Sequence, residues 1–279
     1  MFIGFELTDY SALTQPDDID TWSFPALNDA NVSDLASYIV SMSQTSLHLD
    51  AEKISASLFP RSDYDIFLSH SHADQNKAIE LALSLDKKGV RVFVDSCVWG
   101  HSEKLIELIL KQSGPFNNET REAQIVRVSA AVHTLLSAAI HQMIWRTEAF
   151  VFLRTEKSVP FENDISDRTL SPWIYAELQF SAQVQQVLPK RLKNKETLQS
   201  VTGFESYMTE SKQLRPYEMA FTISKEHLPS VNGSKFRKWY HDLASKKLTE
   251  GGEVLDDLYD TCQISTRYYA HRIDSLELQ

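Results

Sequence analysis

A short apolar segment that ends in a polar cluster constrains the fold of this chain more than any other feature. Residues 64–74 read Tyr-Asp-Ile-Phe-Leu-Ser-His-Ser-His-Ala-Asp, and a helical pattern begins directly afterwards. A buried strand that delivers polar side chains to the start of a helix is typical of open α/β sheets, which bind ligands at the carboxyl ends of their strands. The segment therefore predicts an α/β fold with a ligand site at the end of this strand.

The rest of the chain alternates between strand and helix patterns. Such alternation predicts a parallel sheet with right-handed crossovers and helices on both faces. Gly89 stands where a left-handed helix stop is expected, and Ser171 and Pro172 suit a helix start. The expected strands are 64–69, 90–95, 149–153 and an edge strand at 218–223; the expected helices are 34–42, 74–88, a segment from Ser102, 119–147, 171–187, 234–248 and 252–274.

Composition limits the classes of partner. The formal net charge of -10 over 279 residues argues against a protein that holds nucleic acid or an anionic membrane by bulk charge. No secretory signal is visible at the N-terminus, and the apolar segment Val126–Trp145 is too interrupted by polar residues to predict a membrane span. Cys97 and Cys262 are isolated. We therefore expect a cytoplasmic protein that binds neither nucleic acid nor membrane.

The polar cluster allows a metal interpretation. His70-x-His72-x-Asp74 is close to the His-x-His-x-Asp-His signature that opens the zinc site of the metallo-β-lactamase fold. The sixth position of that signature is Gln75 here, and no Gly-Gly follows. A zinc hydrolase that uses these three side chains is therefore a minor alternative, and nucleotide recognition by the same loop is the preferred interpretation.

Four motifs in order support the nucleotide interpretation, because together they resemble the Toll/interleukin-1 receptor (TIR) family. Residues 64–70, Tyr-Asp-Ile-Phe-Leu-Ser-His, resemble the first TIR box on strand A, and residues 89–95, Gly-Val-Arg-Val-Phe-Val-Asp, resemble strand B. Residues 149–153 resemble strand C. Residues 171–177, Ser-Pro-Trp-Ile-Tyr-Ala-Glu, match the Ser-x-Trp-x-x-x-Glu that begins helix C.

The resemblance implies a flavodoxin-like three-layer sandwich with a central parallel sheet and helical N- and C-terminal additions. The expected division is an accessory segment at 1–62, a TIR domain with a long helical insertion at 63–225 and a helical extension at 226–279. In the enzymatic members of the family a glutamate that matches Glu177 cleaves NAD+, which is a substrate, so no cofactor is expected. The resemblance places the following residues around the nucleotide: Ser69, His70, Ser71, Asp95, Trp99 and Trp173.

The chemistry of this cleavage suits a single carboxylate. Nicotinamide leaves as an already cationic group and needs no proton, so the enzyme must stabilise a ribosyl oxocarbenium and hold the ribose hydroxyls. Trp173 and Glu177 are four residues apart and share one helical face. The residues alone leave plainer roles open: Glu177 as an exposed helix glutamate, Trp173 as a core anchor, Ser69 to Ser71 as a helix cap, and Asp95 as a partner of loop amides.

The family also contains adaptors that assemble receptors without turnover, and these usually lack the glutamate that this chain retains. The chain resembles the stand-alone TIR proteins of Thoeris antiphage defence. That resemblance implies a phage-derived activator, an ADP-ribose-derived signal and a separate effector that receives it. It also implies self-association through the BB loop, here Ser96–Glu103. A non-catalytic TIR scaffold and an NAD-depleting effector are the alternatives.

Overall fold

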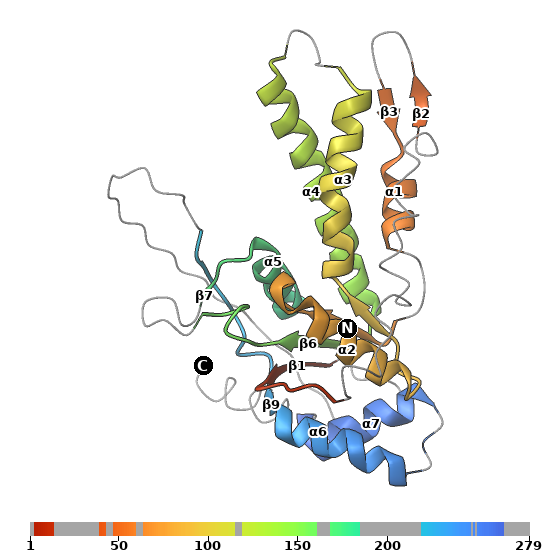
Figure 1. Ribbon diagram of the computed structural model, residues 1–279, viewed down its shortest axis with the longest axis vertical. Helices are drawn as coiled ribbons and strands as arrows, with labels where there is room; N and C mark the ends of the chain where they lie inside the picture. Colours follow the sequence, from red (N-terminus) through yellow and green to blue (C-terminus); the bar gives the residue numbers. More distant parts are fainter. Residues whose placement is uncertain are drawn as a thin grey trace, which may run out of the picture.

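A five-stranded parallel sheet forms the centre of the protein (Figure 1). The computed structural model describes residues 3–13, 39–42, 47–59, 64–114, 119–160, 168–184, 219–246, 248 and 250–264. The α/β class with a central parallel sheet is thereby confirmed. Across the sheet the strands are β5 (Val92–Val94), β4 (Ile66–Ser69), β6 (Ala149–Leu153), β1 (Ile3–Thr8) and β9 (Ser230–Asn232).

The strands are apolar on both faces because helices cover both. Ile66 and Leu68 of β4 face one hydrophobic core, and Phe67 between them faces the other. Side chains on a strand point alternately to the two faces, so β4, β5 and β6 each contribute to both cores, whereas the core residues of β1 and β9 all belong to one of them. Because of this alternation, the position of a residue at the end of a strand determines which of the two helix layers its side chain faces.

One layer contains α2 (Gln75–Asp86), α6 (Gly233–Asp242) and α7 (Gly251–Cys262). In Figure 1, α6 and α7 lie below the sheet. Short 3-10 helices η6 (His72–Asp74) and η8 (Leu243–Ser245) adjoin α2 and α6. The helix expected at 74–88 is confirmed as η6 and α2, and its apolar face consists of Ala78, Leu81, Ala82 and Leu85, all buried in this core.

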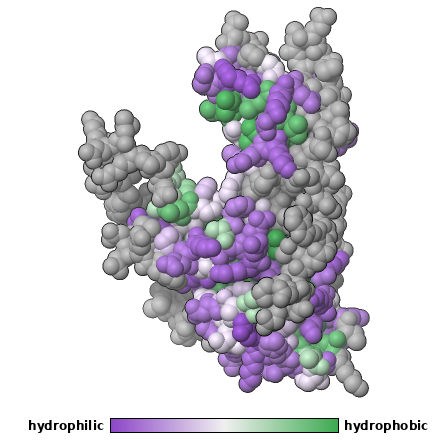
Figure 2. Space-filling view, in the orientation of Figure 1, coloured by the Kyte–Doolittle hydropathy of each residue, from purple (hydrophilic) through white to green (hydrophobic). Residues whose placement is uncertain are grey.

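The other layer contains α5 (Pro172–Gln183) and the sheet-proximal parts of two long helices. The helices α3 (Ser96–Gln112) and α4 (Arg121–Arg146) pack together and extend away from the sheet, beside α1 (Ala51–Leu58) and the hairpin of β2 (Ile39–Met42) and β3 (Leu47–Leu49) (Figure 1). Figure 2 shows an apolar patch near the far end of this projection, where Ile125 and Val126 are exposed.

Helix α4 is long and apolar enough, by length and composition, to cross a membrane, and it is the one such helix among the described residues. Eight of its residues are buried within the protein and face α3, α5 and the sheet. A core helix passes the same test of length and composition, so the cytoplasmic location stays a prediction.

The structure differs from the expected domain division at both ends of the chain. Residues 3–8, expected in an accessory segment, form β1, which lies between β6 and β9. Counted from β4, the first three strands follow the flavodoxin-like order 2-1-3, and β1 then occupies the fourth position. Ile3, Phe5 and Leu7 alternate along β1 and are almost fully buried, so the strand is part of the hydrophobic core.

The C-terminal part differs for the same reason. β9, α6 and α7 bury their apolar side chains on the sheet and complete one of its layers, so they are an integral part of the fold and no appendage. The helix predicted at 234–248 corresponds to α6 with η8. The helix predicted at 252–274 is confirmed as far as Cys262, where α7 ends at a left-handed Gln263, and the residues after Ile264 lie outside those described.

Three local expectations were wrong. Residues 39–42, expected to be helical, form β2. Residues 96–101, expected in a loop that would correspond to the BB loop, form the first turns of α3. In the expected strand 218–223, Phe221–Thr222 forms β8, which pairs antiparallel with β7 (Arg168–Thr169) away from the main sheet. Apolar runs this short fit more than one element, and tertiary pairing decides between them.

Candidate active site

Polar side chains from two strand ends meet a carboxyl group from the helix above them. Ser69 is the last residue of β4, and Asp95 directly follows β5. Ser69 lies two residues after Phe67 and Asp95 two residues after Phe93, so both point to the same face of the sheet as these phenylalanines, which belong to the core under α5. Glu177 in the middle of α5 meets them there, and the exposed fractions of Ser69, Asp95 and Glu177 are 0%, 2% and 1%. The fold thus brings together residues up to about a hundred positions apart.

Helix α5 places Glu177 inward by its periodicity. The hydroxyl of Ser171 accepts a hydrogen bond from the Ile174 N–H at 3.3 Å, and Pro172 occupies the first turn, which together begin the helix as predicted. The buried stripe of the helix consists of Ile174, Glu177, Leu178 and Ser181, at the spacing of one helical face. Glu177 therefore occupies a position that would ordinarily hold an apolar residue.

Burial and a neighbouring carboxylate both favour the protonated form of Glu177. Its pKa lies well above the ordinary value, chiefly because of burial and next because of the negative charge of Asp95. The nearby Ser69 hydroxyl opposes the shift, but the contact lacks standard hydrogen-bond geometry. Among the described residues, neither oxygen of Glu177 nor the Oγ of Ser69 has a hydrogen-bond partner of standard geometry. Burial and the neighbouring charge therefore both favour the protonated form of this carboxyl group over the ionised form.

Asp95 pairs with a buried histidine. The Nδ1 atom of His70 lies 2.8 Å from Oδ1 of Asp95 and 3.2 Å from the Leu68 carbonyl, and its Nε2 lies 2.7 Å from Oγ of Ser96. Burial alone lowers the pKa of His70, but the charge and hydrogen bond of Asp95 outweigh it and the net pKa is raised. Asp95 thus has a histidine partner, whereas its neighbour Glu177 has a raised pKa and no partner of standard geometry, and perturbed carboxyl groups of this kind are typical of functional sites.

A second polar cluster lies at the ends of β4 and β6. The Thr155 hydroxyl, two residues beyond β6, donates a hydrogen bond of 2.5 Å to Oδ2 of the buried Asp74. The Nζ atoms of Lys77 and Lys157 lie 3.1 Å and 3.9 Å from Oδ1 of the same carboxylate. Asp74 therefore connects the start of α2 to the turn after β6.

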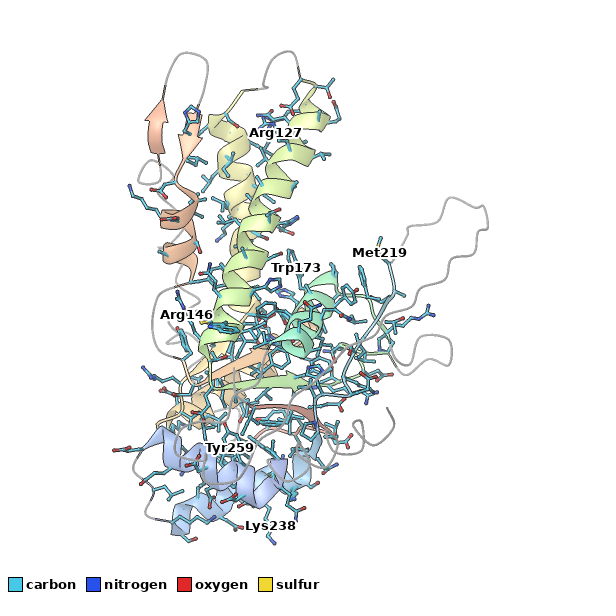
Figure 3. The ribbon with its side chains drawn as sticks, turned by 180° about the vertical axis from the view of Figure 1, so that it is seen from behind. Arg127, Arg146, Trp173, Met219, Lys238 and Tyr259 are labelled. Carbon is cyan, nitrogen blue, oxygen red and sulfur yellow. The ribbon has the colours of Figure 1, made fainter. Side chains whose placement is uncertain are left out.

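The predicted binding residues divide into two groups. Ser69, His70 and Asp95 are brought together with Glu177, whereas Ser71 is half-buried before η6 and its hydroxyl makes no capping hydrogen bond. The ring of Trp173 meets the edge of His133 on α4 at 5.3 Å, so it contributes to the α4–α5 contact, and Figure 3 shows it between these helices. Trp99 lies in α3, and its side chain is outside the described residues.

The three side chains of the zinc alternative do not converge. His70 points to Asp95 and Ser96, His72 is exposed, and Asp74 is held by Thr155 and two lysines. Within the part of the chain that the structure describes, no group of three or more His, Cys, Asp and Glu side chains is placed to hold a metal ion.

Sequence reasoning missed several residues of this region. Ser96 and Thr155 follow strands β5 and β6, so their position after a strand was a signal that could have identified them. The ion pair of Glu6 with Arg154, at 3.1 Å, could not be foreseen because β1 was assigned to an accessory segment.

Comparison with known proteins gives no match: no family model, no curated protein and no solved structure matches this chain. The likeness to TIR domains therefore rests on the four motifs alone.

Proposed function

We propose that this protein is a TIR-type enzyme that cleaves the bond between nicotinamide and ribose in NAD+, with Glu177 as the catalytic carboxylate. The observation that carries the proposal is the state of Glu177. It is a buried carboxyl group with a raised pKa and without a hydrogen-bond partner of standard geometry among the described residues, located where open α/β sheets bind ligands.

The unsatisfied atoms suit ribose hydroxyls. Leaving a buried polar group without a partner costs about 1–3 kcal/mol, so native proteins seldom keep such groups unless a ligand or a functional requirement accounts for them. Two oxygens of Glu177 and the Oγ of Ser69 are in this state beside one another. A carboxyl group and a serine hydroxyl together offer both acceptors and O–H donors, which suits the two hydroxyls of a vicinal diol.

The charge arrangement suits a cationic substrate. Nicotinamide in NAD+ carries a positive charge, which favours the ionised form of a neighbouring carboxyl group. Asp95 already has His70 as its partner, so the group without a partner beside the cation is Glu177, which would release its proton to solvent as the substrate binds. The carboxylate so formed would stabilise the ribosyl oxocarbenium as nicotinamide leaves. Because Glu177 is 1% exposed, α5 or its neighbours must move to admit the substrate, as active-site lids do.

The wider role follows from the TIR resemblance. The likeness to Thoeris proteins supports an ADP-ribose-derived product that signals to a separate effector in bacterial antiphage defence. The same cleavage without a released signal would deplete NAD+, and a TIR scaffold would show no cleavage at all.

The test is nicotinamide release. Purified protein is incubated with NAD+, with and without extract of phage-infected bacteria, and nicotinamide is quantified by chromatography. Glu177→Gln should lower the rate by at least about 100-fold, the size of loss seen when a group that stabilises transition-state charge is removed. Glu122→Gln, on an exposed turn of α4, is the matched control and should retain activity. Mass spectrometry of the second product separates signal synthesis from depletion.

Two results would overturn the proposal. One is a folded wild-type protein that releases no nicotinamide under either condition. The other is a Glu177→Gln variant as active as the wild type. Circular dichroism and the melting temperature establish that each variant is folded.

A further inference from the structure

Two lysines from separate parts of the chain converge on one carboxylate. Lys77 belongs to the first turn of α2, and Lys157 lies in the turn after β6. Their Nζ atoms are 3.1 Å and 3.9 Å from Oδ1 of Asp74, whose side chain is 0% exposed. Thr155 fixes the other carboxylate oxygen at 2.5 Å. The buried carboxylate thus holds two ammonium groups in place at the surface.

The cluster of two lysines and one aspartate has a net charge of one positive unit. The two ammonium groups face a single carboxylate, in a chain with a formal net charge of -10. The side chains of Lys77 and Lys157 are 49% and 56% exposed. An ammonium has three N–H donors. Lys157 uses one on the Ala73 carbonyl at 3.0 Å and Lys77 directs one at Asp74, so donors on both remain available in the described structure.

Stability does not account for the second lysine. One cation is enough to balance the charge of the buried carboxylate, and solvent screening weakens a contact whose lysine is about half exposed. Lys77 already lies within ion-pair distance of Asp74, and Lys157 at 3.9 Å adds a weaker contact. Convergent lysines with free donors are, by contrast, a common way to bind phosphate groups, which they recognise as point charges.

The cluster borders the candidate active site. Asp74 acts electrostatically on His70, which pairs with Asp95 next to Glu177. Thr155 and Lys157 follow β6, and β6 is the neighbour of β4 in the sheet. The ends of β5 and β6, on either side of β4, are roughly 10 Å apart at ordinary strand spacing. A dinucleotide can extend over such a distance along the carboxyl edge of the sheet.

We propose that Lys77 and Lys157 form a diphosphate-binding site for the same ligand whose ribose reaches Glu177. This inference rests on the proposed function, and it adds that the substrate is recognised as a dinucleotide through its diphosphate. Asp74 is a positioning residue that orients the two ammonium groups.

The decisive experiment compares NAD+ with nicotinamide riboside, which carries the same scissile bond and no phosphate. In the double variant Lys77→Gln/Lys157→Gln, KM for NAD+ should rise by about 10- to 100-fold, the range expected for lost charge-assisted hydrogen bonds. Cleavage of nicotinamide riboside should be unchanged. The control is Lys53→Gln/Lys111→Gln, which neutralises two ion-paired surface lysines on α1 and α3 and should alter neither substrate's kinetics.

Direct binding separates this inference from the proposed function. Isothermal titration of wild-type protein with inorganic pyrophosphate and with ADP-ribose needs no turnover, and the lysine variant should lose affinity for both. Lysine-dependent binding without NAD+ cleavage would refute the proposed function and leave the diphosphate site standing.

Other outcomes would overturn the inference itself. Unchanged KM for NAD+ in the double variant is one, and an equal loss with nicotinamide riboside is another, because that pattern indicates a structural effect. If the double variant does not fold, the single variant Lys157→Gln is used instead, because it retains the Lys77–Asp74 pair. This variant should raise the KM for NAD+ but not that for nicotinamide riboside. Kinetics equal to those of the wild type would reject the site.

Discussion

The Nδ1 atom of His70 lies 2.8 Å from Oδ1 of Asp95, and both side chains are buried at the carboxyl end of the sheet. Asp95 outweighs the effect of burial and raises the pKa of His70, which favours an ionic pair. Asp95 is also, after burial, the next cause of the raised pKa of Glu177. This relationship supplies the first of four predictions.

His70 and Asp95 should be energetically coupled. Removing one partner of a buried ion pair leaves an uncompensated buried charge, which costs about 3–5 kcal/mol. His70→Gln and Asp95→Asn should each lower the free energy of unfolding by roughly that amount. The double variant should cost at least about 1 kcal/mol less than the sum of the two. Urea unfolding of the three variants measures the cycle, and additive effects within about 0.5 kcal/mol would contradict the ionic pair.

Glu177 should make the protein less stable as pH rises. Its folded-state pKa is raised, so above about pH 4.5 the unfolded chain releases a proton that the folded protein keeps. Stability from this group is complete below pH 4.5 and falls by about 1.4 kcal/mol per pH unit until the folded-state pKa is reached. Glu177→Gln lacks this slope and should gain stability relative to the wild type with rising pH. A difference that stays constant from pH 4 to 8 would show that Glu177 is ionised in the fold.

His227 should make the protein less stable as the pH falls, opposite to the effect of Glu177. Burial lowers its pKa to about 4, and its Nε2 lies 2.8 Å from Oγ of Ser181 on α5. The unfolded chain takes up a proton below about pH 6.5, but the folded protein resists until about pH 4, so stability falls between these values. The full interval corresponds to about 3 kcal/mol. Thermal or urea unfolding of His227→Gln across this range should lack that loss; parallel curves for variant and wild type would exclude it.

The N-terminal segment, which consists of β1 and the residues directly after it, should be indispensable for folding. Tyr10 donates a short hydrogen bond to the buried Glu80 of α2, and the Leu13 N–H donates to the same carboxylate at 2.9 Å. Tyr10→Phe should lower the free energy of unfolding by about 1–3 kcal/mol, because it removes a donor from a buried carboxylate. Tyr175→Phe, at a half-buried ring stacked on Phe221, is the control and should change stability little.

Deleting residues 1–13 tests the same point more severely. The deletion removes the strand between β6 and β9 and exposes the ladder of both, so a folded product would contradict the central position of β1.

Much of the site could be anticipated from strand ends. Ser69 and Asp95 each end an apolar run, and parallel strands bring their carboxyl ends to one edge of the sheet, so their proximity follows from the pattern. Glu177 was identified by its place in a family motif, because a single glutamate in an amphipathic helix carries no sign of burial. The orientation in which α5 packs on the sheet places Glu177 on the buried stripe of the helix, beside Asp95.

Other elements could not be predicted, since local patterns do not encode distant pairing. Residues 3–8 are apolar enough for a strand, but their partners at 149–153 lie about 145 positions away. Residues 96–101 carry Gly100 and were expected in a loop; packing of α3 against α4 makes them helical.

The sequence by itself determined the α/β class, the strand that ends in Ser69 and His70, and the start of α5 at Ser171, because each depends on local periodicity, capping and turn residues. Only the tertiary structure decided the placement of β1 in the middle of the sheet, the His70–Asp95 ion pair and the burial of Glu177 against it. These depend on which segments are excluded from water together. Desolvation and the distance between charges then determine which carboxyl group holds the proton.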